Sequence, residues 1–199
     1  MEKRQFLSTA AGAIISAVGV SAVPAHATAG FQTSSQVILT IAGAIDRSNR
    51  GKTDNVTDQM MYKQGVHFSR AYTFDLAALE KLPSVTISPT LEYDGKPHKL
   101  NGPRLIDVLD FVGAKKTKDA KILFHSVDGY APEASLDQVR KYDFILATKI
   151  DGKSLSIGGL GPIFAIYDAD RIADFSQKPL NQRFAMCPWG LYYLEVVVG

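Results

Sequence analysis

Cysteine is nearly absent from this chain of 199 residues, which contains a single one, Cys187. An internal disulfide therefore cannot form, and a c-type haem, which needs a C-x-x-C-H motif, is excluded. The thiol lies next to Pro188 and Trp189, a setting that favours a small buried side chain over a metal ligand or nucleophile. Stability must come from the packing of a core, for which a chain of this length is sufficient.

A large excess of charge of one sign is also lacking, since the formal net charge is +2. This balance gives no reason to expect nucleic acid or an anionic membrane as a partner. The chain has no G-x-S-x-G elbow and no H-E-x-x-H segment, so neither an α/β-hydrolase nor a helix-borne zinc protease is supported. Repeats and low-complexity tracts are missing as well, so we expect one ordinary globular domain.

The first 27 residues have the pattern of a cleaved export signal. Lys3 and Arg4 precede an uncharged, largely apolar stretch over 7–23, and a small-x-small cleavage site ends at Ala27. Four hydroxyl side chains interrupt the apolar stretch, which makes a retained membrane anchor the weaker alternative. We therefore expect a single mature domain at 28–199 that works in the periplasm or is otherwise exported.

The export route stays open. The sequence Lys3-Arg4-Gln5-Phe6-Leu7 resembles a twin-arginine signal in which lysine replaces the first arginine. Proteins that carry such a signal cross the membrane already folded. A Lys-Arg pair before an apolar stretch is equally ordinary in a general secretory signal, so both routes remain.

Short apolar and β-branched runs between turn residues predict a series of strands. These strands are expected at 36–43, 85–87, 91–93, 121–125, 144–150, 163–167 and 191–198. Asp94-Gly95 and Asp151-Gly152 are turn signals between strands. The run Gly158-Gly159-Leu160-Gly161 predicts a turn, because it lacks the third glycine of a dinucleotide-binding loop.

Helix signals occur in three segments, at 75–81, 103–113 and 135–141. We expect Thr73 to cap the first helix, Asn101 or Gly102 to cap the second, and Ser135 to form a capping box with Gln138 in the third. Many short strands, a few short helices and no regular βαβ alternation predict a mixed α+β domain.

The potential metal ligands are scattered. His67, His98 and His125 are widely spaced, and each is expected to have a structural role rather than to bind a metal. Asp168 and Asp170 are close in sequence, but two carboxylates are far short of a calcium shell.

A series of landmarks follows in order along the chain. They are Leu82-Pro83, the Leu-x-Gly-x-x-Leu pattern at 100–105, Asp128-Gly129-Tyr130, Ile145-Leu146-Ala147 with Asp151-Gly152-Lys153, Gly161-Pro162, and an aromatic-rich strand at 189–198. In this order they resemble the molybdopterin-binding domain of the sulfite-oxidase type, as found in small exported bacterial proteins. The strand at 37–43 fits too, so the resemblance covers nearly all of the mature chain. It implies a mixed-sheet α+β fold with several short helices.

The same resemblance implies a missing metal ligand. Catalytic members bind molybdenum through a cysteine thiolate that precedes the glycine-helix segment. The corresponding stretch, 86–93, has no cysteine, and Ser88, Thr90 and Glu92 offer hard oxygen donors instead of soft sulfur. Cys187 comes too late in the chain to match. No cofactor is therefore expected, with molybdopterin bound without the cysteine as the alternative.

Three functions are consistent with these observations. The preferred one is a non-catalytic module that binds a small ligand or an exported protein, since a fold does not carry function by itself. The others are a molybdopterin-dependent oxidoreductase and an accessory subunit of an exported redox or signalling system.

If a ligand pocket persists, its expected lining residues are Asn49, Arg50, Asp128, Tyr130, Gly161 and Pro162. Arg50 could hold an anion with both guanidinium nitrogens, and Gly161-Pro162 would allow close approach of the backbone. The alternative is that Asp128-Gly129 is simply a turn and Tyr130 simply packs.

Overall fold

Residues 35–199 are the part of the chain that the computed structural model describes, and they form one unit, Ser35–Gly199. The expected export signal and its cleavage after Ala27 lie outside the described residues. Among the described helices, none combines the length and the apolar character needed to cross a membrane.

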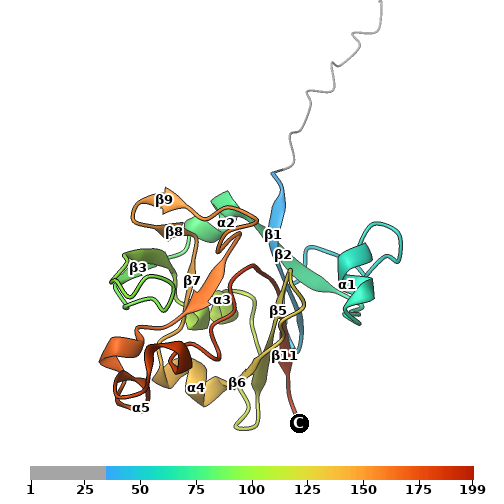
Figure 1. The fold of residues 1–199 in the computed structure, drawn as a ribbon. Helices are drawn as coiled ribbons and strands as arrows, with labels where there is room; N and C mark the ends of the chain where they lie inside the picture. Colours follow the sequence, from blue (N-terminus) through green and yellow to red (C-terminus); the bar gives the residue numbers. More distant parts are fainter. Residues whose placement is uncertain (1–34) are drawn as a thin grey trace, which may run out of the picture. The chain divides into compact units, whose positions relative to one another are not determined.

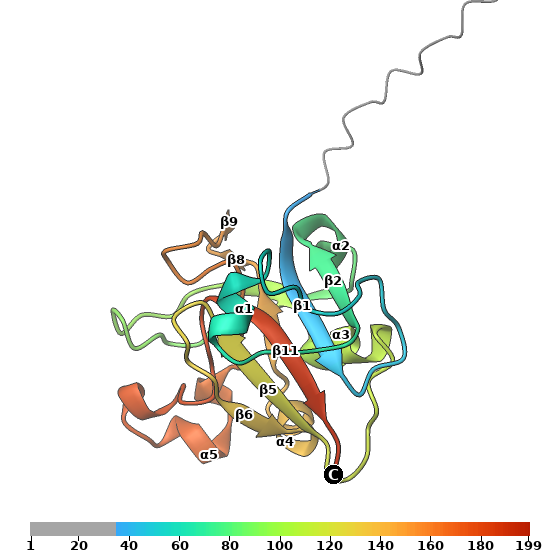
Figure 2. The same ribbon diagram turned by 90° about the vertical axis from the view of Figure 1, so that its right-hand side faces the viewer.

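The central sheet has five strands in the order β2-β1-β11-β5-β6. They are β1 (Val37–Gly43), β2 (Ala71–Asp75), β5 (Lys121–Ser126), β6 (Glu133–Ser135) and β11 (Leu191–Val197). β1 and β11 are parallel, with Thr40 opposite Tyr193, and the other pairs are antiparallel. The first and last described strands therefore lie side by side in the middle of the sheet (Figure 2).

Both faces of this sheet are covered, because alternate side chains of a strand point to opposite faces. Leu39 and Ile41 of β1 join the main core, which includes α3 (Leu105–Phe111) and α4 (Leu136–Lys141). Ala42 joins a smaller cluster with Met61 of α1 (Gln59–Lys63). Figure 1 shows α1 on one side of the sheet and α3 and α4 on the other.

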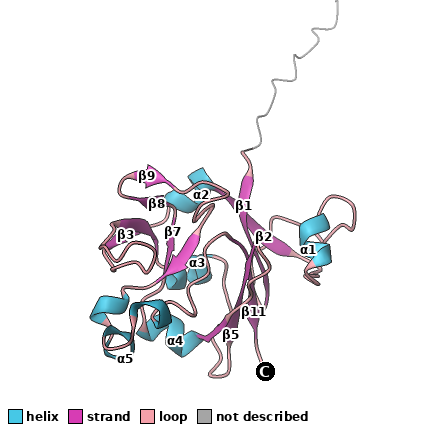
Figure 3. Cartoon of the chain, in the orientation of Figure 1, coloured by secondary structure: helices cyan, strands magenta, loops and turns pink. Residues whose placement is uncertain are grey.

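Two smaller sheets pack beside the main core (Figure 3). The first contains β3 (Ser84–Ile87), β4 (Leu100–Pro103), β8 (Lys149–Ile150) and β9 (Lys153–Ser154), and the second pairs β7 (Ile145–Ala147) with β10 (Phe164–Ile166). The two sheets approach each other closely at Gly102 of β4, because a Cβ atom there would overlap the Leu146 carbonyl of β7. The remaining helices are α2 (Leu76–Glu80), α5 (Ala173–Ser176) and the 3₁₀ turns Ala169–Arg171 and Leu180–Gln182.

This architecture confirms the mixed α+β fold class expected from the sequence. The capping box of α4 is present, since Ser135 Oγ accepts from the Gln138 amide and the Gln138 side chain accepts from the Ser135 amide. Gly113 ends α3 with a positive φ of 68°, as expected. The turns at Asp94-Gly95 and Asp151-Gly152 are also confirmed.

The expected cap of α2 was wrong. Thr73 lies within β2, and Asp75 caps the helix instead, with its Oδ1 atom 2.6 Å from the Ala78 amide nitrogen. Asp75 ends β2, a strand that the sequence pattern did not indicate. The Thr73 hydroxyl was therefore assigned as the cap in place of the Asp75 carboxylate.

The expected start of α3 was also wrong. Asn101, Gly102 and Pro103 belong to β4, where Gly102 is opposite Val85, and the helix begins only after Arg104. Pairing with β3 outweighed the local signals for a cap and a first helical turn.

Two strand predictions need correction. Residues 91–93 form no strand, because Leu91 closes a turn by accepting from the Gly95 amide at 3.0 Å. The run 144–150 divides into β7 and β8, which belong to different sheets.

Candidate functional site

The six residues expected to line a pocket do not share one. Asp128 and Tyr130 line one cavity, and Arg50 and Pro162 line another. Asn49 instead ties its loop to β2, because its Oδ1 atom accepts from the Thr73 amide at 2.7 Å and its Nδ2 atom donates to the Thr73 carbonyl at 3.0 Å. Asn49 is therefore engaged in a structural role.

Gly161 is packed against backbone. A Cβ atom at this position would lie 2.6 Å from the Leu155 carbonyl carbon. The Gly161 amide donates to the Ser156 carbonyl at 3.0 Å. The amide of Gly159 bonds the same carbonyl, so the glycine-rich run is a turn, as predicted.

Arg50 has an intramolecular partner, since its guanidinium is ion-paired with Asp58 and lies over the Phe68 ring at 5.2 Å. It borders an apolar groove of about 240 Å³ whose lining includes Val37, Met60, Ile157 and Pro162. The carboxylate of Asp58 competes for the guanidinium that an anionic ligand would need.

A second cavity, of about 210 Å³, combines the richest set of functional groups. We call it the cysteine pocket; the lining residues used below are Glu92, Tyr93, Asp128, Tyr130, Cys187 and Trp189. Three separate segments build it: the turn between β3 and β4, the turn between β5 and β6, and the segment before β11.

The first two segments are held by local hydrogen bonds. Leu91 and Lys96 close the β3–β4 turn through an amide-to-carbonyl bond of 2.9 Å, which presents Glu92 and Tyr93 to solvent. In the β5–β6 turn, Gly129 has a φ of 87°, and Asp128 Oδ1 accepts from the Tyr130 amide at 2.9 Å. Asp128-Gly129 is thus a genuine turn that also contributes a carboxylate to the pocket.

Tyr130 joins the second segment to the third. Its hydroxyl donates to the Ala185 carbonyl, while 47% of the residue stays exposed. The Cys187 amide donates to the Phe184 carbonyl at 2.8 Å, and the Pro188 carbonyl accepts from Ala165 at 3.0 Å. These contacts fix the wall of the pocket that carries Cys187 and Trp189.

Cys187 is 5% exposed, which confirms the expectation of a buried side chain. Burial raises the pKa of its thiol, the neighbouring Tyr167 hydroxyl opposes this effect, and the negative charge of Glu92 adds to it. The thiol is therefore protonated at neutral pH, whereas binding to a metal requires the thiolate.

The pocket is electronegative. Its lining contains the carboxylates of Glu92 and Asp128 and no lysine, arginine or histidine. Within residues 35–199 neither carboxylate takes part in an ion pair. Burial and the charge of Glu92 together raise the pKa of Tyr93 to about 12. Two carboxylates without basic partners beside exposed aromatic rings form an environment suited to a cation.

A third cavity, of about 350 Å³, lies near β3, α4 and β10. We call it the aspartate pocket; the lining residues used below are Ile87, Arg104, Lys141, Asp168, Arg171 and Ile172. Asp168 Oδ1 is buried there without a hydrogen-bond partner among the described residues. Sequence analysis singled out Asp168 but not this pocket, because the lining residues come from four segments that only the fold brings together.

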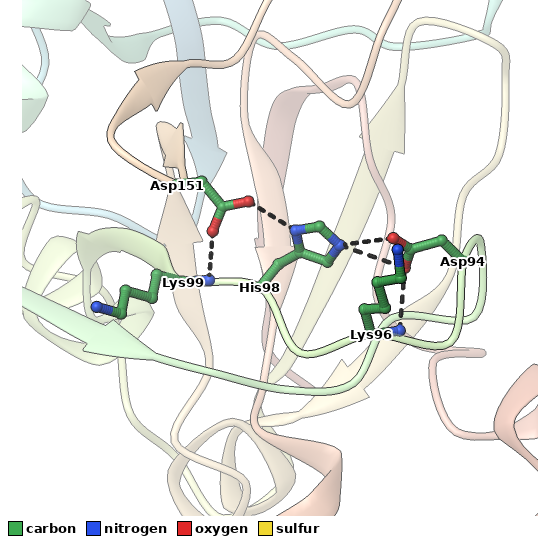
Figure 4. A network of polar contacts seen from close by, with 5 residues as sticks. All are labelled: Asp94, Lys96, His98, Lys99 and Asp151. Carbon is green, nitrogen blue, oxygen red and sulfur yellow. Dashed lines mark hydrogen bonds and ion pairs between the residues drawn. The ribbon is translucent and has the colours of Figure 1, made fainter.

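Each of the three histidines contacts other side chains of the domain. His98 bridges Asp94 and Asp151 (Figure 4), His67 packs edge-on against Tyr62, and His125 packs edge-on against Tyr193. Burial lowers the pKa of His125. No group of three potential metal-binding side chains occurs in the described part of the chain.

The donors that molybdopterin needs are divided between two pockets. Its phosphate calls for cationic side chains and its molybdenum for a thiolate. The cysteine pocket has a thiol but is lined by carboxylates, and the aspartate pocket has cationic side chains but no sulfur. The two linings share no residue, so the residues present do not fit the cofactor.

Comparison with known proteins supports the fold alone. The sequence matches no protein-family model and no curated protein. Among solved structures, the sulfane dehydrogenase SoxCD from Paracoccus pantotrophus is similar, with a TM-score of 0.53 and 13% sequence identity. The match covers 79% of this chain but 37% of the SoxCD chain, so this protein corresponds to a minor part of that enzyme. The described residues therefore have a sulfite-oxidase-like α+β fold, similar to that of the matched part of SoxCD.

Proposed function

We propose that this protein is an exported, non-catalytic binding module, and that its cysteine pocket takes a small organic cation. The observation that carries the proposal is the pairing of two carboxylates, Glu92 and Asp128, with aromatic side chains in a cavity that has no basic residue. A cation gains from the negative faces of aromatic rings and from carboxylates in the same site.

The aromatic side chains are well placed for this role. Tyr93 and Tyr130 are 55% and 47% exposed, so both rings are accessible to a ligand from solvent. Trp189, which is partly buried in the lining, is the single tryptophan of the chain. Its fluorescence therefore reports on this pocket without interference from another indole.

The test is a titration of mature protein with choline, followed by Trp189 emission. The matched control is 3,3-dimethyl-1-butanol, which has the same shape but no charge. We expect choline to shift the emission and to bind at least about tenfold more tightly than the neutral alcohol, which corresponds to ~1.4 kcal/mol. Equal responses to both compounds, or a response to neither, would contradict a cation site.

Two conservative variants locate the charge. Glu92→Gln and Asp128→Asn each remove one carboxylate charge, and the asparagine keeps an acceptor for the Tyr130 amide. Each should weaken choline binding by about five- to tenfold, while Glu133→Gln, on β6 and outside the pocket, should leave it unchanged.

Elemental analysis of protein purified from its native host distinguishes the alternative, an oxidoreductase, from a non-catalytic binding module. Near-stoichiometric molybdenum would support an enzyme and refute a non-catalytic module. The absence of a cysteine between Thr86 and Tyr93 leads us to expect none.

A second candidate function, as an accessory subunit, is favoured by the apolar groove. Val37, Met60 and Ile157 around it are 47%, 42% and 64% exposed. Exposed apolar side chains gathered around one groove are typical of a contact with another protein. Purification of the tagged protein from its host, with a Met60→Glu variant as control, would reveal a partner that depends on the groove.

Export is tested separately at the signal. If the chain crosses the membrane folded, Lys3→Arg should be tolerated and replacement of Arg4 by glutamine should abolish export. Undiminished export of the glutamine variant would favour the general secretory route.

A further inference from the structure

Asp168 is an anomaly of the aspartate pocket. It follows β10 and precedes the 3₁₀ turn Ala169–Arg171, but its side chain makes no capping hydrogen bond there. Its Oδ1 atom is buried without a partner among the described residues. A buried carboxylate oxygen without a donor is costly, and such groups are rare in folded proteins unless a ligand or water completes them.

Arg171, which is exposed, is the second charged residue of this cavity without an ion-pair partner among the described residues. It lines the same cavity, and none of the ion pairs within the described residues includes it. Asp168 and Arg171 therefore carry opposite charges on one cavity without neutralising each other. A single ligand that contacts both needs a positive group and a negative group.

The other charged residues of the cavity are already paired. Arg104 Nε lies 2.9 Å from Asp143 Oδ1, and Lys141 Nζ lies 2.5 Å from Asp174 Oδ2. These pairs leave Asp168 and Arg171 as the charges that are free to select a ligand in this part of the described chain.

We propose that the aspartate pocket binds a zwitterionic amino acid, with the ammonium group on Asp168 and the carboxylate on Arg171. An arginine fork matches a carboxylate in two hydrogen bonds, and an ammonium group supplies the donors that Asp168 lacks. Ile87 and Ile172 in the lining favour an aliphatic side chain. The cavity of about 350 Å³ is within the usual size of a small-molecule site. This site is separate from the cation site proposed above.

The test uses L-leucine and two analogues that each lack one charge, measured by isothermal titration on the mature protein. The first analogue, 3-methylbutylamine, lacks the carboxylate, and the second, 4-methylpentanoate, lacks the ammonium group. We expect leucine to bind at least about tenfold more tightly than either analogue.

Variants assign each contact. Asp168→Asn should weaken leucine by about tenfold or more and leave 4-methylpentanoate unchanged. Arg171→Gln should weaken leucine and 4-methylpentanoate and leave 3-methylbutylamine unchanged. Asp137→Asn, an acid on α4 that is 78% exposed at its side chain, is the matched control and should not alter binding.

A stability measurement that needs no ligand accompanies these titrations. If Asp168 is kept for a ligand, Asp168→Asn should not lower the urea midpoint of the unliganded protein, because it removes an unpaired charge. Absence of binding by leucine and by alanine, valine and isoleucine, or equal binding of leucine by wild type and Asp168→Asn, would overturn the proposal. Glu92→Gln should leave leucine binding unchanged, because Glu92 lines only the cysteine pocket. The leucine test is therefore independent of the choline test.

Discussion

The imidazole of His98 lies between two hairpins, with its Nδ1 atom 2.7 Å from Asp151 Oδ2. Its other nitrogen, Nε2, lies 3.1 Å from Asp94 Oδ2, as Figure 4 shows. Each ring nitrogen faces an acceptor, so both contacts are hydrogen bonds only when both nitrogens carry a proton. Asp151 and then Asp94 accordingly raise the pKa of His98.

This arrangement predicts a pH-dependent contribution to stability. Because the pKa of His98 is higher in the folded state, its contribution is complete below the ordinary histidine pKa of about 6.5 and is lost as pH rises through the raised value. The urea midpoint of wild type should exceed that of His98→Gln at about pH 5.5 and approach it by about pH 8.5. Asp94 and Asp151 stay ionised across this window, because His98 lowers the pKa of both. A difference that does not vary with pH, or one matched by His67→Gln, would contradict the assignment.

Gly102→Ala should be severely destabilising. A Cβ atom at residue 102 would overlap the Leu146 carbonyl, so β4 and β7 must separate to admit it. We expect a loss of about 3 kcal/mol in the free energy of unfolding, measured in urea. Gly51→Ala is the matched control, because a Cβ atom at Gly51 meets nothing within 4 Å, and it should change stability by ~0.5 kcal/mol at most.

Asp75→Ala should cost about 1 kcal/mol, because it removes the side-chain acceptor for the Ala78 amide at the start of α2. Asp75→Asn should retain most of the stability, since asparagine is an equally good cap. Equal losses in the two variants would show that the charge of Asp75, rather than its capping bond, is what matters.

Cys187 should resist thiol reagents in the folded protein. The thiol is buried and its pKa is raised, so the thiolate that reacts is scarce at about pH 8. Labelling with a chromogenic disulfide should be slow in buffer and complete in denaturant. Rapid labelling of the folded protein would contradict this expectation. It would show that the thiolate, the form that binds a metal, is available in the folded state.

Local signals predicted the elements whose stabilisation is local. The capping box of α4, the positive φ at Gly113 and the turn at Asp151-Gly152 depend on neighbours in sequence, and all three are present. Thr73 and Gly102 were misassigned because their strands are defined by pairing with other strands, β1 for Thr73 and β3 for Gly102. Propensity cannot show which distant run will pair with a given segment.

The candidate sites show the same division. Asp128 and Tyr130 were found from a landmark in sequence, whereas Glu92 and Trp189, on the same pocket, come from segments that only the fold brings together. Asp168 was considered as a cation ligand with Asp170, but Asp170 is occupied by Arg183 at 2.7 Å. Asp168 Oδ1 lacks a hydrogen-bond partner among the described residues, and this depends on which atoms the fold places around it.

The parallel pairing of β1 with β11 has a consequence for how the domain is assembled. Residues 37–43 find their neighbour at 191–197, so the middle of the sheet closes only after its two most distant segments have met. Such long-range closure carries a large entropic cost before any contact repays it, and it slows folding. A fragment that stops before Leu191 would expose the inner edges of both β1 and β5, and an unpaired edge of this length invites aggregation.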